Sequence, residues 1–232
     1  MKKITGFALL LALASTGACQ SQDATPSLGT DDAKASYGIG LQMGSRLAPA
    51  ETHMDMAALM AGIRDGMAAN DPAIPQEELQ AALQAFNQTV MEEETARMEE
   101  LAEANTTEGA AFLAENATQS GILVTESGLQ YEVLREGEGP KPVATDRAVL
   151  HYKGTLLDGT QFDSSYDRGE PAEFGVNGVI AGFSEGLQLM NVGSHYRFFI
   201  PSELGYGPGG SGRNIGPNAT LIFEVELLEI VQ

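Results

Sequence analysis

The sequence is poor in the residues on which several classes of protein depend. Cysteine occurs once in 232 residues, at Cys19, so no intramolecular disulfide can form. Lysine and arginine number 13 against 32 aspartates and glutamates, which gives a formal net charge of −19. Nucleic-acid binding requires clustered basic side chains against phosphate, so a nucleic-acid partner is not expected. The histidines at 53, 151 and 195 stand apart without metal-ligand spacing, and neither a metal nor a cofactor is expected.

Residues 1–18 have the pattern of a secretory signal peptide. Lys2 and Lys3 form a positive start, and the apolar run that follows is too short to span a bilayer. Cys19 comes directly after Thr-Gly-Ala, which resembles a bacterial lipobox, although such boxes usually carry Leu, Val or Ile where Thr16 stands. We therefore expect an exported protein, anchored to the outer membrane only through a lipid on Cys19. Cleavage after Ala18 without lipidation, giving a soluble periplasmic protein, is the alternative.

A flexible tether and two short helices are expected next. Residues 19–30 are polar, small and proline-containing, which is typical of a linker. Asp31-Asp32 are expected to cap a helix with Tyr37 and Leu41 on one face. Asp55 is expected to cap a second, methionine-rich helix that ends at Asn70-Asp71-Pro72.

A long helix is predicted from Pro75 to about Thr118. Proline near its start and carboxylates in its first turn suit a helix N-terminus. Two interpretations remain open: one continuous helix of about 65 Å, or an interruption near 105–109 where Asn105 and Glu108 form a new cap. Its charged middle with a thin apolar stripe favours a solvated spacer or a surface that packs against a second chain.

From about Leu123 the pattern changes from helical to alternating. Strands are expected around 124–133, 148–156, 161–163, 194–200 and 219–230, and a short helix at 183–189. Asp158-Gly159 has the composition of a hairpin turn. A curved antiparallel sheet against one helix would form a half-barrel with an apolar groove between the two.

Three motifs carry a family resemblance: FDSSYDRG at 162–169, PSELGYG at 201–207 and ATLIFEVELL at 219–228. Together they resemble the FKBP-type peptidyl-prolyl isomerases. Two short helices and one long helix before such a domain resemble the macrophage infectivity potentiator group and its periplasmic relatives. The resemblance implies an α+β fold: a helical dimerisation region with a long connecting helix, then an FKBP-like half-barrel. The domains would be a signal peptide at 1–18, a tether at 19–30, a helical region at 31–118 and an isomerase domain at 119–232.

The resemblance also implies a set of pocket residues. Asp163, Tyr206, Tyr152 and Phe223 would be catalytic, with the Tyr206 hydroxyl donating to a substrate carbonyl and Asp163 held by Tyr152 and Arg168. The substrate would be bound by Phe162, Val179, Ile180, Phe183, Ile215 and Arg168. Taken singly, each apolar residue is better explained as ordinary core, and Asp163 beside Arg168 as a surface ion pair. Their joint order along some 70 residues favours the pocket.

Two positions depart from the family pattern. Phe183 stands where tryptophan is usual, and this chain contains no tryptophan. Ala172 stands where many members carry another aromatic residue. The loop at 207–216 is rich in glycine, which is typical of a mobile flap. These departures bear on the catalytic rate and on macrolide affinity.

The expected function is peptidyl-prolyl cis-trans isomerisation that assists the folding of exported proteins. Partners would be proline-containing unfolded polypeptides, a second copy of the chain through residues 31–90, and macrolide inhibitors. The alternative is a non-catalytic dimeric chaperone that holds unfolded chains.

Overall fold

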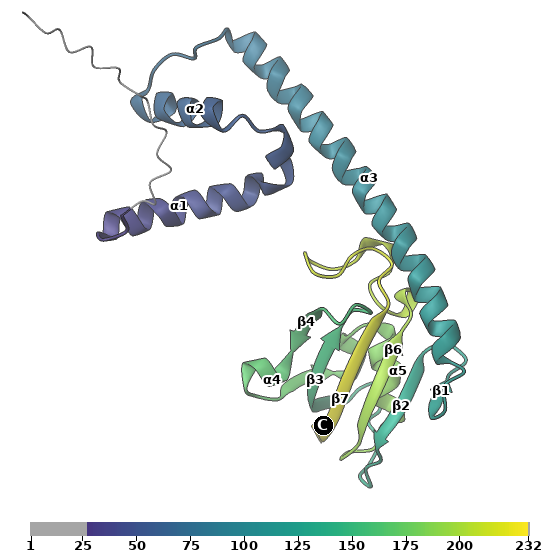
Figure 1. Ribbon diagram of the computed structural model, residues 1–232. Coiled ribbons are helices and arrows are strands. Elements are labelled where there is room, and N and C mark those ends of the chain that lie inside the picture. The colour runs from purple at the N-terminus through teal and green to yellow at the C-terminus, as the bar shows by residue number, and fades with distance from the viewer. Residues whose placement is uncertain (1–26, 232) are drawn as a thin grey trace, which may run out of the picture. The chain divides into compact units, whose positions relative to one another are not determined.

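The structure is a computed structural model that describes residues 27–231, and these fall into two compact units that divide after Met56. Helical elements come first and an antiparallel sheet follows (Figure 1). The predicted signal peptide, residues 1–18, and Cys19 lie outside the described residues. Among the helices described, none is both long enough and apolar enough to cross a membrane.

Helix α1 spans Asp31–Leu47, and a 3-10 turn, η1, follows at Ala48–His53. Its N-cap is Thr30, whose hydroxyl oxygen accepts the backbone N–H of Ala33 at 3.2 Å. The prediction that Asp31 and Asp32 cap this helix is therefore wrong. Both lie in its first turn, where carboxylates interact favourably with the positive end of the helix dipole.

Helix α2 spans Met56–Ala68. It ends in a C-cap of the Schellman type, because Ala69 takes a positive φ of 54° and the Asn70 N–H donates to the Asp65 carbonyl at 3.0 Å. Neither α1 nor α2 buries any of its residues.

Helix α3 is continuous over 41 residues, Gln76–Asn116. A rise of 1.5 Å per residue gives it a length of about 60 Å. The interruption considered at 105–109 is absent, and Asn105 does not cap a new helix. The side-chain amide of Asn105 instead donates a hydrogen bond outside the helix, to the carbonyl oxygen of Pro217 at 2.7 Å.

One seven-stranded antiparallel sheet follows α3. Its strands are β1 (Ile122–Val124), β2 (Gln130–Arg135), β3 (Arg147–Thr155), β4 (Gln161–Ser164), β5 (Ala172–Gly175), β6 (His195–Ile200) and β7 (Leu221–Val231). The order across the sheet is β1-β2-β6-β7-β3-β4, and β5 also pairs with β3. The two longest strands, β3 and β7, therefore lie side by side near the middle of the sheet.

The core lies between this sheet and helix α5 (Ala181–Leu189). In β7, buried residues alternate with half-buried ones from Leu221 to Leu227, because successive side chains of a strand point to opposite faces. The buried set joins Phe183 and Leu187 of α5 in one apolar cluster. The predicted fold class, a helical region followed by a half-barrel sheet on one short helix, is confirmed.

Local predictions for the sheet had mixed outcomes. The Asp158-Gly159 hairpin turn is confirmed: it joins β3 to β4, with Gly159 at a φ of 84°. The segment expected as one strand at 124–133 is two, β1 and β2, separated by a turn at Gly128. Two elements were not expected, β5 and the one-turn helix α4 (Ser165–Arg168). The four-part domain division stays a prediction.

Candidate active site

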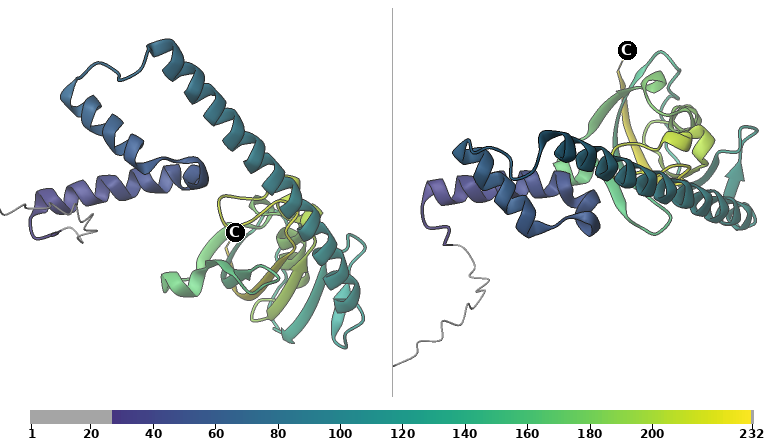
Figure 2. Two further views of the ribbon diagram at one scale, coloured as in Figure 1. Left: turned by 45° about the horizontal axis from the view of Figure 1, so that its top comes forward. Right: turned by 90° about the horizontal axis from the view of Figure 1, so that it is seen from above.

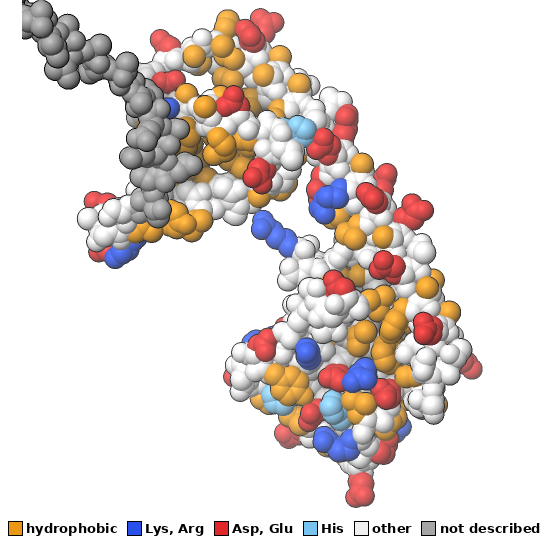
Figure 3. Space-filling view, viewed as in Figure 1, with side chains coloured by type: hydrophobic (Ala, Val, Ile, Leu, Met, Phe, Trp, Pro, Cys, Tyr) orange, Lys and Arg blue, Asp and Glu red, His pale blue; other side chains and the backbone are white. Residues whose placement is uncertain are grey.

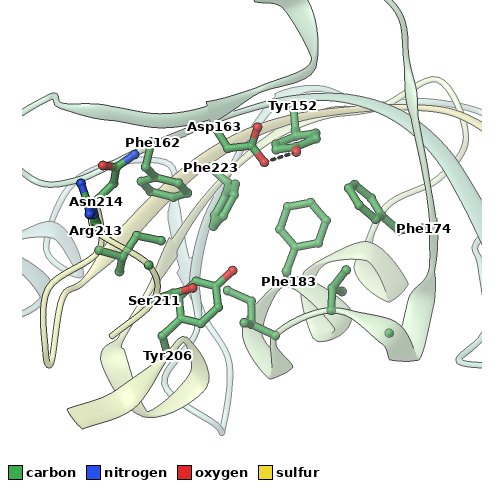
Figure 4. Close-up of a pocket in the computed structure, with 15 residues that line it drawn as sticks. Tyr152, Phe162, Asp163, Phe174, Phe183, Tyr206, Ser211, Arg213, Asn214 and Phe223 are labelled. Atoms are coloured by element: carbon green, nitrogen blue, oxygen red, sulfur yellow. Dashed lines mark hydrogen bonds between the residues drawn. The ribbon is translucent and has the colours of Figure 1, made fainter. Parts of the chain in front are cut away.

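A cavity of about 640 Å³ opens between the sheet, α5 and the loop before β7. Figure 4 shows its side chains converging from strands β3, β4, β5 and β7, from α5 and from the loop. The lining residues are Tyr152, Phe162, Asp163, Phe174, Gly178, Val179, Ile180, Phe183, Tyr206, Ser211, Gly212, Arg213, Asn214, Ile215 and Phe223. The pocket is thus built from segments far apart in the sequence.

Aromatic rings packed edge to face form one side of the cavity. The ring centroid of Phe223 lies 4.9 Å from that of Phe183 and 5.4 Å from that of Phe162, with interplanar angles of 75° and 80°. Tyr152 packs edge-on against Phe174 at 5.6 Å. Edge-to-face pairs stabilise one another beyond simple area burial, so these rings form a fixed apolar surface.

A single carboxylate interrupts this apolar surface. Asp163 accepts a hydrogen bond from the Tyr152 hydroxyl and another from Arg168 Nη1 at 2.6 Å. Arg168 Nη2 also donates to the Tyr152 hydroxyl oxygen at 3.0 Å, and the guanidinium carbon lies 5.4 Å from the centroid of the Tyr152 ring. The three side chains therefore hold one another, and Asp163 presents a fixed edge to the cavity.

These contacts set the protonation states of the three groups. Burial is the largest influence on the pKa of Asp163 and acts to raise it, but the hydrogen bonds from Tyr152 and Arg168 together outweigh burial. The pKa of Asp163 consequently lies below its ordinary value, and the group is a carboxylate at neutral pH. Burial and the bond to Asp163 raise the pKa of Tyr152, so its hydroxyl keeps its proton.

Ser165, the first residue of α4, holds the backbone of Tyr152 in place. Its side chain is fully buried, and its Oγ accepts the Tyr152 backbone N–H at 2.8 Å and donates to the Tyr152 carbonyl at 3.2 Å. His151 Nδ1 lies 3.0 Å from the same Oγ. The two serines of the FDSSYDRG motif thus stabilise α4: Ser164 caps that helix, and Ser165 joins it to β3.

The structure brings nine of the ten sequence-predicted pocket residues to the lining of one cavity. Arg168 is the exception, since it lies behind Asp163 and acts on the cavity only through it. Sequence reasoning missed Phe174 and Gly178, and it included residues 211–214 only as part of a glycine-rich flap. Phe174 lies two residues after Ala172, so strand alternation could have placed both on one face, had the short strand β5 been recognised. The roles of these residues stay a prediction.

An antiparallel sheet curved over one helix, with an aromatic pocket between them, is the architecture that the sequence motifs predict for an FKBP-type isomerase domain. Comparison with protein families agrees. Residues 139–228 match the model described as "FKBP-type peptidyl-prolyl cis-trans isomerase", and residues 32–133 match the model described as "Domain amino terminal to FKBP-type peptidyl-prolyl isomerase".

Relatives match over nearly the whole chain. The FKBP-type 22 kDa peptidyl-prolyl cis-trans isomerase of Escherichia coli K12 is 48% identical, over 89% of this chain and 99% of that protein. The outer membrane protein MIP of Legionella longbeachae is 40% identical, over 99% and 97% respectively. The crystal structure of FkpA from Escherichia coli superimposes with a TM-score of 0.66 at 37% identity, covering 88% of this chain and 98% of that one. The chain belongs to the FKBP-type peptidyl-prolyl cis-trans isomerase family.

Proposed function

We propose that the cavity binds X–Pro segments of exported polypeptides and catalyses rotation about the prolyl bond. The observation that carries this proposal is the cavity itself, about 640 Å³ in volume, with aromatic rings on its walls and one anchored carboxylate at its edge. An X–Pro amide loses conjugation as it twists, so the twisted form is less polar than the planar, well-hydrated form. An apolar groove favours the twisted form, and this differential binding lowers the barrier.

The polar groups of the pocket orient the substrate. Tyr206 lies across the pocket from Asp163, and its side chain is 41% exposed, which suits a hydroxyl that donates to a substrate carbonyl (Figure 4). Phe162 and Phe223 would form the walls and Phe183 the floor for the prolyl ring. Phe183 is 3% exposed, so it is also part of the core.

A protease-free isomerisation assay on a proline-containing peptide tests the proposal. The mature protein should accelerate isomerisation, and a pocket-blocking macrolide should suppress the acceleration. Tyr206→Phe removes one hydrogen bond to the transition state, worth about 1 to 1.5 kcal/mol, and should lower kcat/KM about tenfold. Asp163→Ala should lower it similarly. Unchanged kcat/KM in both variants would show that the assigned roles are wrong.

The helical region is proposed to join two copies of the chain through residues 31–90. Support comes from α1 and α2, which expose Ile39, Leu41 and Met67 by 60%, 57% and 86% and bury none of their residues. Figure 3 shows hydrophobic side chains on the surface of this region. Large exposed apolar surfaces of this kind are typical of sites where proteins interact.

Sedimentation analysis of the double variant Leu41→Glu/Met60→Glu should show a monomer. Gln42→Glu is the matched control, because it adds a charge to the polar side of α1 and should leave the dimer intact. A monomeric wild-type chain would refute the proposal.

A chaperone function is the second candidate, and the solvent-exposed N-terminal half of α3 favours it. An open groove of about 840 Å³ runs along residues 80–99, where Leu83 and Met91 are 53% and 70% exposed. The chain can be compared with residues 76–232, which retain α3 and the isomerase domain. If the shorter chain isomerises peptides but no longer suppresses aggregation, residues before 76 supply the chaperone activity and the groove along residues 80–99 is not sufficient for it. A shorter chain that folds but does not isomerise would favour the binding-only function.

Export with a lipid anchor at Cys19 completes the proposal. The similarity to a relative named as an outer membrane protein supports it. Labelled palmitate should be incorporated into the wild-type chain and not into Cys19→Ser, which should fractionate with soluble periplasmic proteins. Absence of label in the wild type would favour the soluble alternative.

A further inference from the structure

The pocket loop, residues 206–218, supplies six of the fifteen residues that line the cavity: Tyr206, Ser211, Gly212, Arg213, Asn214 and Ile215. Two backbone pairings fix its internal shape. At its base the Asn218 N–H donates to the Gly207 carbonyl at 2.9 Å, and near its tip Ser211 and Ile215 form an antiparallel bridge. Its place over the sheet depends on what the base contacts.

The base of the pocket loop contacts helix α3. The Asn105 side-chain amide donates to the Pro217 carbonyl at 2.7 Å. The side-chain amide of Asn218 lies 3.5 Å from the Ala102 carbonyl oxygen. Gly216 packs so closely that a Cβ there would lie 2.9 Å from Leu101 Cδ2. In all three ribbon views the C-terminal half of α3 runs along the isomerase domain (Figures 1 and 2).

These contacts follow one face of the helix. Leu101, Asn105 and Gly109 are four residues apart, and residues at this spacing lie one above the other on a helix. All three are buried or half-buried, whereas Glu103 and Thr106 between them are exposed. Gly109 meets Thr220, directly before β7, where a Cβ would overlap the threonine Oγ1. The face is therefore a docked surface, and Asn105 is its polar centre.

We propose that Asn105 is a positioning residue of the isomerase pocket: it holds the base of the pocket loop, and through it Tyr206 and Ile215, in place for catalysis. This inference rests on the proposed function of the cavity. Pro217 is buried, and its carbonyl finds its donor on a helix that precedes the whole isomerase sheet in sequence. A buried carbonyl that loses its donor is destabilised unless the chain around it moves, and here the chain that moves is the pocket loop.

Asn105→Ala and the nearly isosteric Asn105→Asp, which cannot donate at neutral pH, test the proposal. Asn191→Ala is the matched control, because the Asn191 amide also donates to a backbone carbonyl, that of Gly137 at 3.0 Å, but away from the pocket. Amide hydrogen exchange across 206–218 and kcat/KM for a proline peptide are measured on the full chain. Both Asn105 variants should speed exchange in the loop and lower kcat/KM about tenfold, as expected when reacting groups shift by a fraction of an ångström.

The outcomes separate this inference from the proposed function. Wild-type loop protection and wild-type kcat/KM in Asn105→Ala would overturn it, and so would an equal effect of Asn191→Ala. Hydrogen exchange does not depend on catalysis, so the positioning role is measurable even if the wild-type chain proves inactive.

A second inference comes from the charges of the cavity. The charged side chains of its lining are Asp163 and Arg213. Asp163 is neutralised by Arg168 at 2.6 Å, whereas Arg213 forms no salt bridge with any residue that the structure describes. Arg213 stands between the bridged residues Ser211 and Ile215, at the tip of the pocket loop. Figure 4 shows it at the rim on the side of Phe162.

We infer that Arg213 selects X–Pro segments that carry a carboxylate next to the X–Pro pair. The inference rests on the same proposed function. A chain with a net charge of −19 repels acidic peptides in general. The unpaired guanidinium of Arg213 attracts a peptide carboxylate locally, and it would orient an acidic peptide at the rim of the cavity. Exposed ion pairs are weak, which predicts a preference for a glutamate peptide over a lysine peptide of about two- to tenfold at low salt.

Matched peptides with Glu, Gln or Lys beside the X–Pro pair provide the test. The Glu-to-Lys ratio of kcat/KM should fall toward one in Arg213→Gln, should invert in Arg213→Glu, and should shrink in about 0.5 M salt because of screening. A ratio near one in the wild type, or a ratio unchanged by Arg213→Glu, would overturn the inference. Activity on the Gln peptide tests the isomerase function separately.

Discussion

Gly154 offers a sharp test of the pocket geometry. It is a buried residue of β3 on the same face as Tyr152, and the two aromatic walls close over it. A Cβ at this position would lie 2.5 Å from Phe162 Cε2 and 2.9 Å from Phe223 Cε1. Only a residue without a side chain lets both rings reach the cavity.

The variant Gly154→Ala should distort the walls without removing any functional group. Ordinary contacts of a Cβ begin at 3.4 Å, so the Phe162 ring must retreat by about 0.9 Å, the difference between 3.4 and 2.5 Å. Overpacking of this kind costs about 1 to 3 kcal/mol of stability. A displacement near 1 Å at a reacting site costs on the order of 10²-fold in rate, so kcat/KM should fall between about ten- and a hundredfold.

Gly178→Ala is the matched control. Gly178 also lines the cavity, but a Cβ there would meet no atom within 4 Å. Urea unfolding and the protease-free peptide assay should show near wild-type behaviour for Gly178→Ala and losses in both measurements for Gly154→Ala. If Gly154→Ala is folded and isomerises peptides at the wild-type rate, the two phenylalanines are not the walls of the productive groove.

Three further predictions concern the groups around this pocket. Ser165→Ala leaves the Tyr152 N–H without its partner in a fully buried position, so urea unfolding should show a loss of about 1 to 3 kcal/mol. Arg168→Gln should lower the stability only slightly at pH 7, because the ion pair is nearly half exposed and therefore screened by water. The pKa of Asp163 is depressed in the folded state, so this contribution is present above its unfolded pKa near 3.9 and is lost as the pH falls through the folded pKa. The wild type and Arg168→Gln should accordingly converge in stability as the pH falls below the folded-state pKa of Asp163, and a difference that persists to the acid limit of folding would contradict the assignment. Phe183→Trp should enlarge the floor of the pocket, and about 1 kcal/mol of added apolar contact would tighten macrolide binding about fivefold in a calorimetric titration; weaker binding would show that the floor has no room for the larger ring.

The sequence predicts those parts of the fold whose signal is local. The amphipathic pattern of α2, the alternation of β7 and the turn at Gly159 depend on neighbouring residues, and all three appear as expected. Strand β5 and the separation of β1 from β2 escaped prediction because β1 has only three residues and β5 only four. Their existence depends on pairing with β3 and β2, which no local pattern records.

The candidate site shows the same division. Motif residues such as Phe162 and Asp163 were named in advance because they belong to one distinctive string. Ser165 and Asn105 were not given their present partners, because those partners lie on other elements: Tyr152 on β3 for Ser165, and Pro217 in the pocket loop for Asn105. A hydrogen bond between residues 112 positions apart leaves no trace in the sequence of either segment.

The docking of α3 has a mechanical consequence. From Leu101 onward the helix is fixed to the sheet, and Gln130 in β2 seals its end by donating to the Leu113 carbonyl at 2.8 Å and accepting from Asn116 at 2.9 Å. From Glu92 to Glu100 almost every residue is exposed. The isomerase domain therefore cannot rotate freely about the C-terminal end of α3. Any change in the orientation of the isomerase domain must come from elastic bending of the solvated middle of α3. The helix is therefore a stiff connection that can bend, and not a flexible linker.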